Sequence, residues 1–155
     1  MKRRLAIVIG LLSAVGPAIA APPTDTSEAI SSMAFGSCGK QDRPQPIWHA
    51  IVDDDPDLFI FLGDNIYADT EDMKLMRRKY GLLAAKPGFA ELRETTPIVA
   101  TWDDHDYGEN DAGHEYPQKV ASQREFLRFF EEPADSSRWR QGGVYDEMTF
   151  GPAGR

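Results

Sequence analysis

The fold is decided by two stretches in which an apolar run ends in a cluster of carboxylates: residues 58–69, LFIFLGDNIYAD, and residues 98–111, IVATWDDHDYGEND. Each run is short and rich in β-branched or aromatic residues, which is typical of a strand covered on both faces of a parallel sheet. Open α/β sheets place their ligand crevice at the carboxyl ends of the strands. We therefore expect the two acidic turns to meet at one edge of a sheet.

Carboxylates crowded in this way repel one another or take up protons unless a cation lies among them. Asp103, Asp104 and Asp106 offer hard oxygen ligands, and His105 adds an imidazole. Taken alone, Gly63-Asp64 is compatible with an ordinary tight turn, and His105 with a surface ion pair. Taken together, the two stretches predict a metal site in which His105 is placed to donate a proton to a leaving group.

The rest of the chain alternates between strand-like and helix-like segments. We expect strands over residues 30–37, 58–62, 98–102 and 144–150, helices over 44–52, 71–83 and 117–131, and a short helical turn over 89–92. In the last helix, Val120, Leu127 and Phe130 are expected to form one apolar side. This order predicts an α/β layered fold with at least part of a parallel sheet.

The two ends of the chain carry signals of a different kind. Residues 1–20 combine a basic start, an apolar run and an A-x-A site ending at Ala20, which is typical of a cleaved secretory signal. We expect a flexible leader over residues 21–29, one domain over 30–155, and a periplasmic or secreted location. The final residues 151–155, GPAGR, have turn chemistry just after an expected strand. We therefore expect the chain to be part of a longer protein.

Charge and cysteine content narrow the partners. The formal net charge of −8 becomes −11 without residues 1–20, because that segment carries three positive charges and no negative ones. An acidic surface argues against nucleic acid or anionic lipid as the main partner. The lone cysteine, Cys38, has no internal disulfide partner, and no histidine is placed by the sequence as the base that a cysteine nucleophile needs.

A calcium-binding module is the main alternative to an enzyme. With Asp104 as position 1 of an EF-hand loop, Asp106, Asn110 and Glu115 fall at positions 3, 7 and 12. Position 6 is Glu109 instead of the turning glycine, and the preceding segment has a strand pattern instead of a helical one. A secreted, non-catalytic calcium-binding module that uses the loop 103–115 stays the second hypothesis.

Five short motifs carry a resemblance to a known family: 35–38, FGSC; 63–69, GDNIYAD; 101–108, TWDDHDYG; 110–111, ND; and 115–117, EYP. With these motifs the chain resembles alkaline phosphatase D, the PhoD-like branch of the calcineurin-like metallophosphoesterases, from about Met33 to Gly151. The resemblance implies a calcineurin-like layered α/β sandwich that is incomplete at its C-terminus.

The resemblance also implies a binuclear-type metal centre that holds ferric iron and calcium. Asp64 matches the metal-bridging aspartate of the family, and Tyr67 matches the tyrosinate that binds the ferric ion. Cys38 stands where a first metal ligand is expected, and Asp104 where a ligand of the second metal is expected.

The implied activity is hydrolysis of phosphate mono- or diesters by in-line attack of a metal-bound hydroxide. His105 matches the proton donor or phosphate contact, and Asn65 and Asn110 are expected to contact a small phosphoester substrate. The superfamily completes its metal site with histidine-bearing loops further along the chain, whereas the last histidine in this sequence is His114. We therefore expect an amino-terminal part of a phosphatase that is inactive alone and exposes an apolar sheet face and edge.

Overall fold

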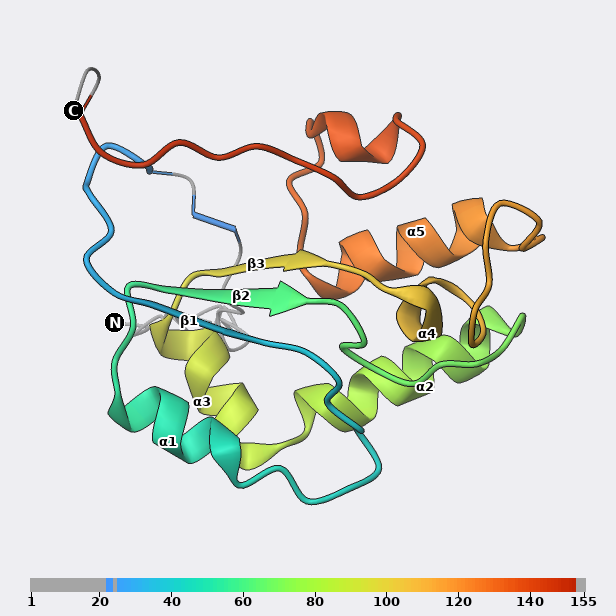
Figure 1. Ribbon diagram of the computed structural model, residues 1–155, viewed down its shortest axis with the longest axis horizontal. Helices are drawn as coiled ribbons and strands as arrows, with labels where there is room; N and C mark the ends of the chain where they lie inside the picture. Colours follow the sequence, from blue (N-terminus) through green and yellow to red (C-terminus); the bar gives the residue numbers. More distant parts are fainter. Residues whose placement is uncertain (1–21, 24, 153–155) are drawn as a thin grey trace, which may run out of the picture.

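The computed structural model describes residues 22–23 and 25–152, so the predicted signal segment lies outside the described residues. Three parallel strands form a sheet in the order β1-β2-β3 (Figure 1). The strands are β1 (Met33–Gly36), β2 (Leu58–Leu62) and β3 (Ile98–Thr101); the helices are α1 (Ile47–Asp53), α2 (Met73–Ala84), α3 (Pro87–Thr95), α4 (Asp104–Tyr107) and α5 (Lys119–Phe129), followed by the 3₁₀ turn η1 (Ser137–Trp139). The predicted mixed α/β fold with a parallel sheet is confirmed. The calcineurin-like sandwich stays a prediction.

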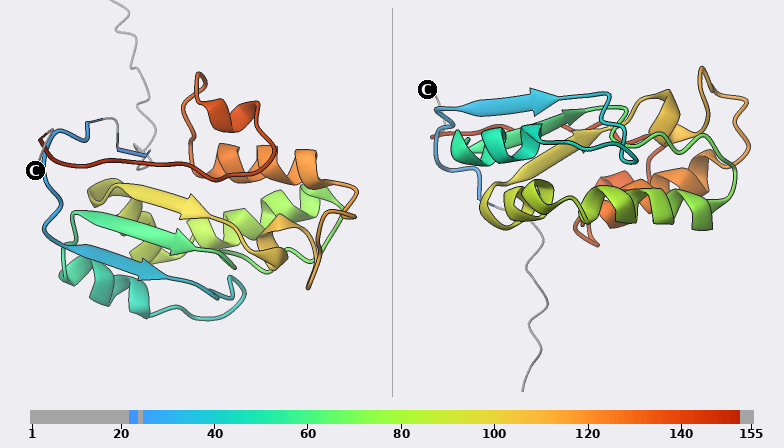
Figure 2. Two further views of the ribbon diagram at one scale, coloured as in Figure 1. Left: turned by 45° about the horizontal axis from the view of Figure 1, so that its top comes forward. Right: turned by 90° about the horizontal axis from the view of Figure 1, so that it is seen from below.

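The core lies on the helical side of the sheet, where α1 and α3 pack (Figure 2). Because side chains alternate along a strand, Phe59 and Phe61 of β2 point to this side. There the ring of Trp48 lies 5.6 Å from that of Phe59 and 5.0 Å from that of Phe89 of α3. This aromatic packing fixes β2, the central strand, against the helices.

Helix boundaries follow local chemistry. Helix α2 begins after Asp72, whose side chain accepts a hydrogen bond from the backbone N–H of Lys74 at 2.8 Å. Pro87 opens α3 at a position where its missing N–H costs nothing, and this helix is longer than the turn expected over 89–92. The acidic stretch after β3 forms the short helix α4, capped by Asp103.

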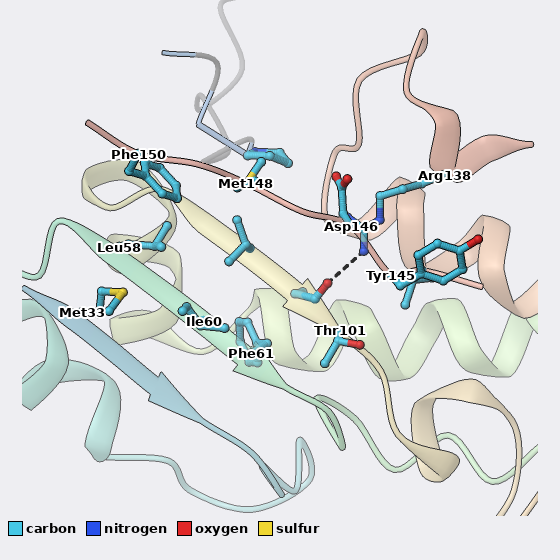
Figure 3. A pocket seen from close by; sticks show the side chains of 14 residues that line it. Met33, Leu58, Ile60, Phe61, Thr101, Arg138, Tyr145, Asp146, Met148 and Phe150 are labelled. Carbon is cyan, nitrogen blue, oxygen red and sulfur yellow. Dashed lines mark hydrogen bonds between the residues drawn. The ribbon is translucent and has the colours of Figure 1, made fainter. Parts of the chain in front are cut away.

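The strand expected over residues 144–150 is absent, and this prediction was wrong. The segment is extended, but it runs along the open face of the sheet instead of pairing beside β3 (Figures 1 and 3). Side chains hold the start of the segment: Gln141 donates to the carbonyl of Tyr145 at 2.6 Å, and Gln123 bonds to both the N–H and the C=O of Gly143, the residue before it. The guanidinium of Arg138 donates a hydrogen bond to the carbonyl of Ala100 on β3 at 2.9 Å, so that carbonyl already has a partner.

A hollow of about 520 Å³ lies between this segment and the sheet (Figure 3). Leu58 and Ile60 of β2 line it on the sheet side, and Met148 and Phe150 line it on the other side. The segment therefore covers this apolar face only in part.

The expected apolar side of α5 is also wrong in one position. Leu127 and Phe130 are buried, but Val120 is 58% exposed. The first turns of α5 bury polar side chains instead: Ser122 donates to the carbonyl of Tyr107 at 2.5 Å. The N-terminal end of α5 therefore packs against α4 through hydrogen bonds, not through apolar contacts alone.

The edge of the sheet at β1 is apolar and open. Met33 and Phe35 are 58% and 69% exposed, and no strand among the described residues pairs with the outer side of β1. None of the helices in the described part of the chain is long and apolar enough to cross a membrane.

Candidate metal centre

The parallel strands deliver the predicted site residues to one edge of the sheet. Cys38 follows β1, Asp64 follows β2, and Asp104 and His105 follow β3. Ligand atoms of Asp64, Asp104 and His105 all lie within 4.8 Å of one another. The two acidic turns therefore meet, as the strand pattern predicted.

Asp64 also contacts the residues that follow β1. The Cys38 thiol lies 3.6 Å from Asp64 Oδ2. Burial, followed by hydrogen bonding to Asp64 and Cys38, raises the pKa of the Tyr67 phenol well above its usual range. Asp64 thus lies between Cys38 and Tyr67 on one side and Asp104 and His105 on the other.

The donor set fits hard metal cations. Asp64 is only 8% exposed, and its Oδ1 atom has no hydrogen-bond partner among the described residues. A buried carboxylate oxygen without a partner is costly, and a cation among the carboxylates removes that cost. A cation would also supply the charge that the Tyr67 phenol needs in order to ionise.

Hydrogen bonds favour the ionised form of the Asp104 carboxyl. Its Oδ2 accepts the backbone N–H of Asp111 at 2.5 Å, and its Oδ1 accepts that of His105 at 3.0 Å. The hydrogen bond from Asp111, helped by the nearby His105, holds the pKa of the Asp104 carboxyl below its usual value.

His105 is oriented by Asp69, a residue that the sequence reasoning did not single out. The Nδ1 atom lies 2.6 Å from Asp69 Oδ1, which leaves Nε2 as the ring nitrogen free for chemistry. Burial acts to lower the pKa of His105, but the hydrogen bond and charge of Asp69, with Asp64 and Asp104 behind them, raise it overall. The signal for Asp69 was available, since it closes the same turn that Asp64 opens.

Asn65, expected to contact substrate, is buried beneath the site, and a contact with substrate stays a prediction. It is 1% exposed, and its amide donates to the carbonyl of Thr101 at 2.8 Å and to the carboxylate of Asp106. Asn65 therefore joins the turn after β2 to the end of β3. Its role is to hold the site together.

Two of the three aspartates at 103–106 also serve the scaffold. Asp106 is fully buried and accepts the backbone N–H groups of Asp103 at 2.7 Å and Asn65 at 3.1 Å, while the Asp103 side chain accepts from Asp104. Only Asp104 of the three belongs to the ligand cluster. The burial of Asp106 also removes position 3 of the alternative EF-hand loop.

Asn110 lies at the margin of the site. It is exposed, its side chain donates to Asp111 at 2.6 Å, and its backbone N–H donates to Asp69 Oδ1 at 3.1 Å. It thus helps to hold the carboxylate that orients His105. A contact between Asn110 and substrate stays a prediction.

Backbone conformation brings the two acidic turns together. Gly63 has φ +106°, and a Cβ atom there would lie 2.7 Å from the Cβ of Asp103. Asp64, Cys38 and Asp69 have φ values of 52°, 58° and 43°, a region that non-glycine residues rarely adopt. Such conformations persist only where surrounding contacts hold them, and they cluster at functional sites.

The backbone of Tyr67 is held from both sides. Gln41, 4% exposed, accepts the Tyr67 N–H at 2.9 Å and donates to its carbonyl at 3.3 Å. Lys79 of α2 donates to the carbonyls of Tyr67 and Ala68 at 2.8 and 2.7 Å. The turn that carries Tyr67 is therefore tied to the loop after β1 and to α2.

Comparison with known proteins agrees with this arrangement. The sequence model of the PhoD-like phosphatase family matches residues 33–138, which include all the residues of the ligand cluster. Among solved structures, one titled "Structure of PhoD" superposes with a TM-score of 0.56 at 18% identity, over 72% of this chain and 26% of that chain. No curated protein sequence gives a significant match. The chain thus spans about a quarter of the length of the solved structure.

Proposed function

The chain belongs to the family of PhoD-like phosphatases, and from this premise we propose that its acidic edge takes part in metal-dependent hydrolysis of phosphate mono- or diesters. The observation that carries the proposal is Asp64, a buried carboxylate with an unpartnered oxygen between two groups of candidate ligands.

The residues suit two different cations. A phenolate beside a carboxylate is a hard oxygen donor set that suits ferric iron, so we assign Asp64 and Tyr67 to it, with the Cys38 thiolate as a further ligand. Carboxylate oxygens favour calcium, so we assign Asp64 and Asp104 to the second metal. When bound, such ions would supply Lewis-acid chemistry, neutralising phosphoryl charge and making water acidic.

The proton transfer belongs to His105. With Nδ1 bonded to Asp69, a protonated His105 has its second N–H at Nε2, which can give the proton to the departing ester oxygen as the P–O bond breaks. A positioned general acid of this kind is typically worth about 10²- to 10⁴-fold in rate.

Metal binding provides the test. In the mature chain, residues 21–155, titration with Fe³⁺ should give a visible absorption band of a ferric phenolate. The Tyr67→Phe variant should lose the band, whereas Tyr145→Phe, in an exposed tyrosine, should keep it. Hydrolysis of bis(4-nitrophenyl) phosphate is followed in parallel. Retention of the band in Tyr67→Phe, or its loss in Tyr145→Phe, would refute the assignment of Tyr67 to the iron.

Export is part of the proposal and rests on the pattern of residues 1–20. The N-terminal sequence of the protein recovered from the producing cells would test it. A chain that still begins at Met1 would contradict the expected cleavage after Ala20.

A further inference from the structure

A second, smaller pocket lies directly beside Asp64, at the carboxyl end of β1. Its volume is about 170 Å³. Apolar residues of three elements line it, namely Phe35, Ile47, Trp48, Ile51 and Phe61. An apolar cavity of about 150 Å³ is large enough to bind benzene. The pocket therefore has the size and walls for one phenyl ring next to the candidate metal ligand.

The pocket is open at its rim and closed at its floor. Trp48 and Phe61 are 5% and 4% exposed, whereas Ile47 is 58% exposed. A large apolar side chain left in water at the mouth of an apolar pocket favours a ligand that covers it.

One polar group in the wall lacks a partner. The amide oxygen of Gln45 accepts the indole N–H of Trp48 at 2.7 Å, and because that N–H can only donate, the orientation of the amide is fixed. Its other end, Nε2, is buried and has no hydrogen-bond partner among the described residues. A Cβ atom on Gly39, which also lines the pocket, would lie 3.3 Å from it. The pocket thus offers one donor for a ligand oxygen.

We propose that this pocket binds the alcohol part of the substrate, an aryl or short alkyl group of about the size of a phenyl ring, with Gln45 Nε2 donating to an oxygen of that group. The inference rests on the proposed function and specifies its substrate class. Sugar and nucleoside esters are disfavoured, because their many hydroxyls would lose water against walls that are mostly apolar.

Binding is tested on the metal-free mature chain with phenol as the probe, following the ¹⁵N–¹H signal of the Trp48 indole. We expect a saturable shift. Ile47→Trp narrows the rim and should weaken binding at least about tenfold. Val120→Trp is the matched control, because Val120 has the same 58% exposure on α5, outside this pocket, and it should bind as the wild type does. A shift that never saturates, or equal affinity in both variants, would overturn the proposal.

A second variant tests the donor. Gln45→Glu keeps the oxygen that accepts from Trp48 and replaces Nε2 by an acceptor. Anisole, whose oxygen can only accept, should bind this variant several-fold more weakly than the wild type, whereas phenol, which can also donate, should retain its affinity. An equal effect on both probes would refute the donor role. Because no metal is present, a failure of phosphoester hydrolysis leaves this result intact, and hydrolysis without phenol binding would reject only the subsite.

Discussion

Gly63→Ala tests whether close approach of the two acidic turns builds the site. The substitution adds one methyl group at a residue with φ +106°, where the new Cβ would lie 2.7 Å from the Cβ of Asp103 and 2.9 Å from its backbone nitrogen. These atoms belong to the cap of α4, so they cannot move aside without shifting Asp104 and His105. The turn after β2 must then shift away from the turn after β3.

The expected cost has two parts. A left-handed backbone costs a residue with a Cβ about 1–2 kcal/mol, and forcing an extra methyl into a packed contact costs about 1–3 kcal/mol. The variant should therefore lose about 2–5 kcal/mol of its free energy of unfolding, a large share of the 5–15 kcal/mol that is typical of a domain. Metal affinity should fall as well, because Asp64 and Asp104 move apart.

Gly81→Ala is the matched control for this measurement. Gly81 is exposed in α2, and a Cβ there meets no atom within 4 Å, so the same methyl should stabilise the helix by about 0.5–1 kcal/mol. Urea unfolding followed by circular dichroism gives both values, and calorimetric titration gives the metal affinity. If Gly63→Ala unfolds within about 0.5 kcal/mol of the wild type and binds metal equally well, the reasoning is wrong.

Three further predictions concern the ligands, the C-terminal segment and pH. Asp64→Asn should abolish metal binding in calorimetric titrations, whereas His105→Gln should retain it while slowing any turnover; equal metal loss in both would make His105 a ligand. Gln123→Leu removes the bonds to the carbonyls of residues 138, 141 and 143, at 2.7, 2.9 and 3.0 Å, and should cost about 2–4 kcal/mol in urea unfolding. The hydrogen bond from Ser31 lowers the pKa of exposed Asp57, so the stability that Asp57 contributes is complete above its unfolded pKa and is lost as the pH falls through its lower folded pKa. Asp57→Asn should therefore flatten the acid side of a plot of unfolding midpoint against pH. An unchanged slope would count against this.

The sequence predicted the parallel strands and their meeting point because both depend on local pattern. Continuous apolar runs ending in acids predict buried strands, and parallel strands share a carboxyl edge, so the approach of Asp64 to Asp104 followed from spacing alone. The same logic failed for residues 144–150. Their composition suits a strand, but pairing depends on tertiary contacts: Arg138 already bonds to the outward carbonyl of Ala100 on β3, and the segment lies over the face of the sheet instead of beside that strand.

Which aspartates serve the site was also beyond the sequence. The sequence does not distinguish Asp103, Asp104 and Asp106. In the structure, α4 directs Asp106 into the core and leaves Asp104 in the cluster with Asp64 and His105. The burial of Asn65 was beyond the sequence for the same reason, since the number of contacts around an amide is set by the assembled fold. Asp69 was missed because its importance comes from a 2.6 Å contact with a histidine that lies 36 positions away.

The two free edges of the small sheet differ as templates for self-association. Pro97 offers its carbonyl to β2, and by alternation the carbonyl of Ala100 faces outward, where Arg138 already occupies it. A guanidinium stays charged at every accessible pH, so an incoming strand finds that acceptor on β3 taken. In the described part of the chain, no strand pairs with the outer edge of β1, where Met33 and Phe35 are exposed. A sheet with one edge open to pairing can associate only as a closed two-fold dimer, whereas a sheet with both edges open can add further copies and grow into fibres.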